Sequence, residues 1–218
     1  MSNREQRRAS RNWFNKGKKH AAENRISDLD YILKNILSYY PNNLTCLDVG
    51  CAEGDMLDYF SKRFSRVVGL EKYDSLFNVA AAKFADAASI EVVRGDILTD
   101  KIDEYDFTFC LGVLHYFDLE SEKLTVLRNV LSNTRCFSFF RTAFYENKSF
   151  SENNSAKVLK KATKIKTISQ AAWECGFRWM FFDNTYRGQG DRRLGDLVVF
   201  QRINGVNTNL DAVLLSRQ

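Results

Sequence analysis

The stretch Thr45–Phe60, TCLDVGCAEGDMLDYF, constrains the fold of this chain more than any other. An apolar run reaches an acidic residue, Asp48, and small residues then follow at alternate positions, Gly50, Ala52 and Gly54. An amphipathic run comes directly after them. This pattern predicts a strand that ends at a tight turn, and a helix that begins there. Small residues in such a turn let the backbone approach a ligand closely, and the first helical amides are free to bind it.

Strand-like and helix-like segments alternate along the rest of the chain. Seven segments have the composition of strands: 44–49, 66–70, 90–94, 105–111, 136–141, 178–184 and 197–202. Helical spacing occurs at 27–40, 56–64, 75–85, 120–131 and 168–175. We expect Ser27 to cap the first helix, Asp118 to cap a helix from Leu119, and Gly176 to end the last. The alternation predicts an α/β fold with a mainly parallel sheet covered on both faces. No helix separates the last two strands, so we expect a hairpin with an antiparallel strand at 197–202.

The positive charge is concentrated at the N-terminus. Residues 1–25 contain eight Lys and Arg against two Glu, whereas the whole chain of 218 residues has a net charge of +5. We therefore expect a basic arm at 1–26, which either meets phosphate or another anionic surface or is simply solvated. The length suits one domain, expected at 27–203, with a polar insertion at 146–166 and a C-terminal tail at 204–218.

Cysteine and histidine usage favours a reducing compartment and argues against a metal site. The five cysteines are widely spaced with no Cys-x-x-Cys pair, which favours free buried thiols. With only two histidines, a zinc site would need unusual geometry. No apolar run approaches the length of a membrane span. We expect a cytoplasmic protein without metal or membrane span, and leave the oligomeric state open.

The glycine turn departs from two common phosphate-binding patterns. A Walker loop needs Gly-Lys-Ser/Thr, which does not follow here. A dinucleotide fingerprint needs a third glycine three residues after the second, so the observed spacing disfavours an oxidoreductase with a nicotinamide cofactor. Asp48 would repel a pyrophosphate and would attract a cationic group.

The run Asp48-Val49-Gly50-Cys51-Ala52-Glu53-Gly54 resembles the first motif of class I S-adenosylmethionine-dependent methyltransferases, with Ala52 where glycine is commoner. The resemblance covers about residues 44–202. It implies a Rossmann-like, seven-stranded fold that binds S-adenosylmethionine and releases S-adenosylhomocysteine. By the same resemblance, Glu71 ends the second strand and holds the ribose hydroxyls, Asp96 and Ile97 lie at the adenine, and Leu111 lines the methyl-donor site. The implied cofactor-binding residues are Asp48, Gly50, Ala52, Gly54, Glu71, Asp96, Ile97 and Leu111.

Methyl transfer is an in-line displacement, so alignment of the reacting atoms is the main requirement. A base is needed only if the acceptor still carries its proton at neutral pH. His115, after the fourth strand, is the candidate base because histidine titrates near neutrality. A histidine bonded to a nearby backbone carbonyl is the alternative.

Three functions are consistent with the sequence. The first is transfer of a methyl group to an oxygen or nitrogen atom of a small or medium acceptor, such as a sugar, lipid head group or metabolite. The second is RNA methylation that uses the basic arm, and the third is a non-catalytic scaffold that keeps the nucleoside pocket. Asn/Asp-Pro-Pro-aromatic and Pro-Cys motifs of nucleobase methyltransferases are absent. Candidate acceptor residues are Trp13, Phe14, Tyr116, Arg141, Tyr145 and Arg187.

Overall fold

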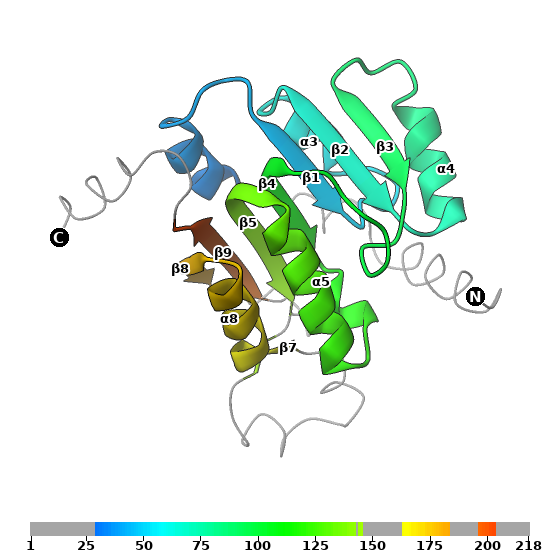
Figure 1. The fold of residues 1–218 in the computed structure, drawn as a ribbon. Coiled ribbons are helices and arrows are strands. Elements are labelled where there is room, and N and C mark those ends of the chain that lie inside the picture. The colour runs from blue at the N-terminus through cyan, green and yellow to red at the C-terminus, as the bar shows by residue number, and fades with distance from the viewer. Residues whose placement is uncertain (1–28, 143, 146–162, 184–195, 204–218) are drawn as a thin grey trace, which may run out of the picture. The chain divides into compact units, whose positions relative to one another are not determined.

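The computed structural model describes residues 29–142, 144–145, 163–183 and 196–203 (Figure 1). Compactness divides the chain into two units, one ending at Asp96 and the other beginning at Ile97. Seven strands make up the main sheet, three of them from the first unit and four from the second. A mixed seven-stranded sheet with helices confirms the predicted fold class.

Three parallel strands form the sheet of the first unit, in the order β3-β2-β1. Its elements are a helix at 29–37, β1 (Thr45–Val49), α3 (Leu57–Ser61), β2 (Arg66–Glu71), α4 (Asp74–Lys83) and β3 (Ile90–Arg94). The two inner strands are buried almost throughout, as expected for parallel strands covered on both faces. In register, Asp48 lies opposite Gly69, and Glu71 lies opposite Arg94. The carboxyl ends of β1 and β2 therefore lie side by side.

A polar cluster ties the first helix of this unit to α3. Asp30 accepts a hydrogen bond from the Tyr59 hydroxyl at 3.3 Å and forms ion pairs with Lys34 and Arg63. The Arg63 guanidinium also lies 3.8 Å from the centroid of the Tyr59 ring. These contacts hold the first helix of this unit against α3.

The second unit contains four strands of the main sheet in the order β4-β5-β9-β8. Its elements are β4 (Tyr105–Leu111), a 3₁₀ turn at Leu114–Tyr116, α5 (Glu120–Ser132), β5 (Thr134–Thr142), β6 (Phe144–Tyr145), β7 (Thr163–Lys164), α8 (Ile165–Glu174), β8 (Phe177–Asp183) and β9 (Asp196–Arg202). β4 and β5 are parallel, and β9 is antiparallel to both β5 and β8. The predicted hairpin and antiparallel strand are confirmed.

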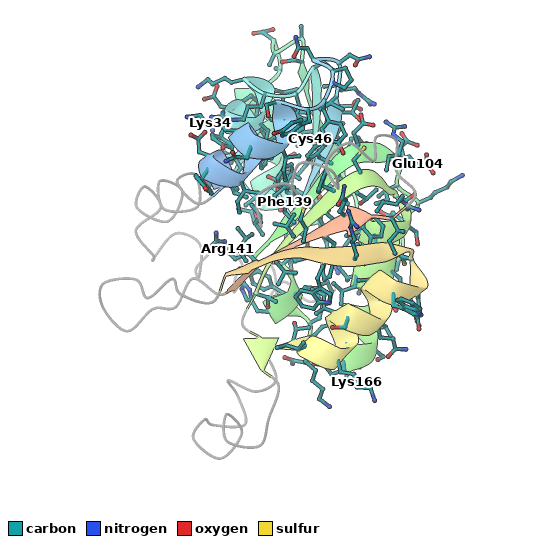
Figure 2. All side chains as sticks on the ribbon, turned by 90° about the vertical axis from the view of Figure 1, so that its left-hand side faces the viewer. Lys34, Cys46, Glu104, Phe139, Arg141 and Lys166 are labelled. Carbon is teal, nitrogen blue, oxygen red and sulfur yellow. The ribbon has the colours of Figure 1, made fainter. Side chains whose placement is uncertain are left out.

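Helices α5 and α8 lie side by side over the strands of the second unit (Figure 1). Arg128 of α5 pairs with Glu174 of α8 at 2.7 Å, and the Thr167 hydroxyl donates to Glu120 at 2.7 Å. Stacked aromatic rings of β4 and β5 fill part of the core, with Phe109 and Phe139 at 4.7 Å between centroids. Phe139 and Arg141 both lie on β5 (Figure 2).

Several predicted boundaries need correction. Asp118 is not the N-cap of α5; Leu119 takes that position, and its N–H donates to the Glu122 carboxylate at 3.4 Å. α3 begins one residue later than predicted, because residues 52–56 still belong to the turn, and it ends at Ser61, three residues before the predicted end. α8 begins at Ile165, three residues early, after Thr163 and Lys164 pair with β6. Gly176 ends that helix as predicted, with a φ of 74°. Ser27 lies outside the described residues.

The described residues include no helix long and apolar enough to cross a membrane.

Candidate functional site

The turn after β1 has three left-handed residues within five positions. The φ angles are 71° at Gly50, 53° at Ala52 and 77° at Gly54. Ala52 is the one non-glycine residue with a positive φ in the described part of the chain. A residue with a Cβ pays about 1–2 kcal/mol for this conformation. Such strain persists only where surrounding contacts hold it in place.

Two neighbouring residues of β2 hold this turn. The N–H groups of Gly50 and Cys51 both donate to the Leu70 carbonyl, at 2.7 and 3.1 Å. The Ala52 N–H donates to Oε2 of Glu71 at 2.9 Å. The turn is thus bonded to the end of the adjacent strand by both backbone and side chain, which fixes its backbone conformation.

At Gly69 and Gly54, the absence of a Cβ lets the turn pack closely against neighbouring side chains. A Cβ at Gly69 would lie 2.7 Å from Sγ of Cys51 and 2.8 Å from Leu57, so only glycine lets β2 approach the turn so closely. A Cβ at Gly54 would lie 2.6 Å from the Phe84 ring. The sequence analysis identified Gly54 but missed Gly69. A glycine inside a strand, such as Gly69, is a recognised sign of close backbone approach.

Glu71 is the central charged group of the turn. Its side chain is buried, at 4 % exposure, and its Oε1 accepts from the Tyr73 N–H at 2.9 Å. Burial raises the pKa of Glu71, while the N–H groups of Tyr73, Ala52 and Lys72 lower it in part. A carboxylate has about four lone-pair positions, so acceptor capacity remains for a ligand beside these backbone donors.

Asp96 lies beyond the carboxyl end of β3 and is paired with Lys72. The distance from Nζ of Lys72 to Oδ2 of Asp96 is 2.6 Å, and both side chains are largely buried. Next to this pair, Arg94 forms a second ion pair with Asp74, the first residue of α4. The sequence analysis did not single out Lys72, although it directly follows Glu71.

Asp48 is buried at the end of β1, with 4 % exposure. Burial and the charge of Asp48 raise the pKa of the thiols of Cys46 and Cys51 well above their usual range. Both thiols are therefore unreactive packing groups. All five cysteines are free, and three are buried.

The remaining candidates lie in the second unit. Leu111 ends β4 at 7 % exposure, and Gly112 follows it with a φ of 86°. His115 lies in the 3₁₀ turn and is partly exposed, with its ring centroid 4.2 Å from that of Tyr116. Tyr116 is 48 % exposed.

Two other candidates are more enclosed than the sequence suggested. Arg141 lies within β5, one residue before its end, and is 2 % exposed (Figure 2). Ile97 is 5 % exposed, and its carbonyl accepts from Nδ2 of Asn129 at 2.8 Å. Trp13, Phe14 and Arg187 lie outside the described residues, and of Tyr145 only the backbone is described.

In the described part of the chain, no three His, Cys, Asp or Glu side chains are grouped so that they could hold a metal ion.

Comparison with known proteins shows what part of the chain and its fold are similar to. Residues 46–134 match a family model described as a methyltransferase domain. The fold matches a solved amino pentose methyltransferase from Micromonospora echinaspora, with a TM-score of 0.64, 14 % identity, and coverage of 89 % of this chain and 95 % of that one. Residues 46–134 are therefore similar to a methyltransferase domain, and the fold is that of solved methyltransferases.

Two further proteins extend the comparison. The solved N-methyltransferase NodS from Bradyrhizobium japonicum WM9, in complex with S-adenosyl-L-homocysteine, matches with a TM-score of 0.61 at 15 % identity, over 81 % of this chain and 87 % of that one. The ribosomal RNA small subunit methyltransferase A of Mycoplasma mycoides subsp. mycoides SC is 31 % identical over 98 residues, or 42 % of this chain. That match covers only 36 % of the curated relative's length.

Proposed function

We propose that this chain transfers the methyl group of S-adenosylmethionine to an oxygen or nitrogen atom of an acceptor, and that it binds the donor at the turn after β1. The observation that carries the proposal is the geometry of this turn. Three left-handed residues, Gly50, Ala52 and Gly54, lie beside a buried carboxylate at the end of the next strand. Ligands of open α/β sheets bind beyond the carboxyl ends of the strands.

The acceptor groups and negative charges of the described residues would complement an adenosine that carries a cationic sulfur. Glu71 has acceptor capacity for ribose hydroxyls after its two 2.9 Å backbone bonds. Asp96 would accept from the adenine amino group, and Asp48 supplies negative charge at the strand end. No lysine follows Gly54, and negative charge at Asp48 opposes binding of a pyrophosphate. The contacts of Ile97 and Leu111 to the donor stay predictions.

When bound, S-adenosylmethionine supplies a methyl group already activated on a sulfonium sulfur. The methyl carbon bonds to the acceptor as its bond to sulfur breaks, and the sulfur keeps the electron pair. The residues of the chain need to align the acceptor with the donor and exclude water. Where the acceptor is a hydroxyl or a protonated amine, its proton must leave, and His115 is the candidate to receive it.

We propose a small or medium acceptor as the first candidate. The fold relatives support this reading, since the titles of two name an amino pentose methyltransferase and an N-methyltransferase. An RNA acceptor is the second candidate, and its support is the partial match to a ribosomal RNA methyltransferase together with the basic arm at 1–26. A cytoplasmic location fits the free buried thiols.

The arm offers a way to separate these acceptors. We propose that Trp13 and Phe14 help to enclose the acceptor while the arginines around them attract an anionic group. The test is transfer of labelled methyl from S-adenosylmethionine to separate RNA and small-metabolite pools, with the full chain and with a variant lacking residues 1–20. We expect label in the small-metabolite pool with the full chain, and its loss without the arm at nearly unchanged donor binding.

Other outcomes of this assay have definite meanings. Salt-sensitive labelling of the RNA pool would favour the second candidate, because phosphate contacts weaken steeply with salt. Donor binding without label in either pool would indicate a non-catalytic scaffold. Full-rate transfer by the shortened chain would contradict the role of the arm.

A further inference from the structure

The carboxylate of Glu71 accepts hydrogen bonds from the backbone of its own chain, and a role in ribose binding alone does not require them. Oε2 accepts from the Ala52 N–H and Oε1 from the Tyr73 N–H, both at 2.9 Å. With 4 % exposure, the group cannot exchange these partners freely for water. A buried carboxylate is tolerated when backbone donors satisfy it. Both oxygens of Glu71 are therefore engaged by the backbone of its own chain.

The residue that Glu71 holds is the strained one. Ala52 has a φ of 53°, and its neighbours Gly50 and Gly54 reach positive φ without a Cβ. The bonds from Gly50 and Cys51 to the Leu70 carbonyl fix the start of the turn but do not reach Ala52. The bond to Glu71 is the described contact that fixes the N–H of Ala52 itself.

A glycine in β2 lets the turn lie close enough for the hydrogen bond between Ala52 and Glu71 to form. Gly69, two residues before Glu71, lies against Sγ of Cys51, and any Cβ there would approach it to 2.7 Å. A larger residue at 69 would lift the turn away from β2 and lengthen the bond between Ala52 and Glu71. Gly69 and Glu71 thus act on the same feature, the distance between the turn and β2.

We propose that Glu71 is a positioning residue, which holds the Gly50–Gly54 turn in its donor-binding conformation through Ala52 before any donor arrives. This role is distinct from a contact with the ribose, and its effect on donor affinity rests on the proposed function. It predicts that loss of Glu71 disturbs the turn in the free protein, and weakens binding even of a ligand that has no ribose hydroxyls.

The first experiment needs no donor. Amide hydrogen exchange of the full chain is measured residue by residue, for the natural protein and the variants Glu71→Ala and Glu91→Ala. Glu91 is a suitable control because it lies on β3 and pairs with Arg66 at 2.7 Å at the surface. We expect the Ala52 amide to be protected in the natural protein and in Glu91→Ala, and to exchange at least tenfold faster in Glu71→Ala.

The second experiment separates positioning from ribose binding. The affinities of S-adenosylhomocysteine and of its 2′,3′-dideoxy analogue are measured for the natural protein and for Glu71→Ala. We expect the substitution to weaken both ligands by a similar factor, at least tenfold. If the analogue binds both proteins equally, Glu71 acts only on the hydroxyls and the inference is wrong.

Two outcomes distinguish a failure of this inference from a failure of the proposed function. If the natural protein binds neither ligand, the proposed function fails, and the exchange rates still decide the role of Glu71. If Glu71→Ala does not fold, Glu71→Gln replaces it, because glutamine retains one acceptor oxygen and loses one of the two backbone bonds. An Ala52 amide that exchanges freely in the folded natural protein overturns the inference without any variant.

Discussion

At the scale of single residues, two carboxylates at neighbouring strand ends give the proposed donor site its charge. Glu71 is fixed by backbone amides, whereas Asp96 is fixed by the ammonium group of Lys72 at 2.6 Å. The ion pair orients the carboxylate of Asp96. A carboxylate has about four lone-pair positions, so it can accept from a ligand beside Lys72. A single charge-assisted hydrogen bond to a ligand is worth about 1.5–3 kcal/mol in a buried setting.

Asp96→Ala should weaken binding of S-adenosylhomocysteine by about 10- to 100-fold, since each 1.4 kcal/mol corresponds to a factor of ten. The loss should be smaller for S-inosylhomocysteine, which has a carbonyl oxygen in place of the adenine amino group. Calorimetry with each ligand gives the ratio of the affinity for S-adenosylhomocysteine to the affinity for S-inosylhomocysteine. The control is Asp74→Ala, which removes the acid of the adjacent Arg94 pair and should leave the ratio unchanged. An unchanged ratio in Asp96→Ala would show that Asp96 does not recognise the amino group.

The identity of the key residues could be read from the sequence, but their partners could not. The small-residue turn and Glu71 at the end of the second strand follow from local pattern and family resemblance. The bond from Ala52 to Glu71 joins residues 19 positions apart, and it depends on how closely β2 approaches the turn. The predicted strand ended at Arg141, because nothing local shows that β5 extends to Thr142.

At the scale of elements, the C-terminal strand is locked to helix α5. Arg202 of β9 donates from Nε to the Thr134 carbonyl at 2.7 Å, and from Nη2 to the Leu131 carbonyl at 3.1 Å. Its guanidinium lies 4.8 Å from the centroid of the Phe177 ring. A cation at the end of a helix also interacts favourably with the helix dipole. Arg202 thus joins α5, β5, β8 and β9.

Arg202→Met should lower the free energy of unfolding by about 1–3 kcal/mol, because charged donors to buried carbonyls are lost. Denaturant titration measures this change. The matched control is Arg135→Met, which removes a surface ion pair with Asp106 and should cost less than about 1 kcal/mol. Equal losses in the two variants would contradict a locking role for Arg202.

The centres of the strands could be predicted because apolar runs and flanking turn residues are local signals. The ends of several elements could not. Pairing of Phe144 with Thr163 joins distant segments, and the start of α8 at Ile165 directly follows this pairing. Asp118 looked like a cap by residue type, but the helix begins one residue later with Glu122 bonding back to Leu119.

At the scale of the whole molecule, the strand order and the antiparallel β9 match the Rossmann-like fold of class I methyltransferases. This much was predictable, since alternating elements and a terminal hairpin leave few topologies. The acceptor was not predictable, because acceptor recognition depends on segments that vary within one fold. Of the candidate acceptor residues, Trp13, Phe14 and Arg187 lie outside the described part of the chain.

The central claim is that the turn after β1 binds S-adenosylmethionine. Isothermal titration of the full chain with S-adenosylmethionine, S-adenosylhomocysteine and NAD tests it most directly. We expect saturable binding of both sulfur nucleosides with one ligand per chain, and no measurable binding of NAD, whose pyrophosphate would meet the charge of Asp48. Binding of NAD without either sulfur nucleoside would contradict the account.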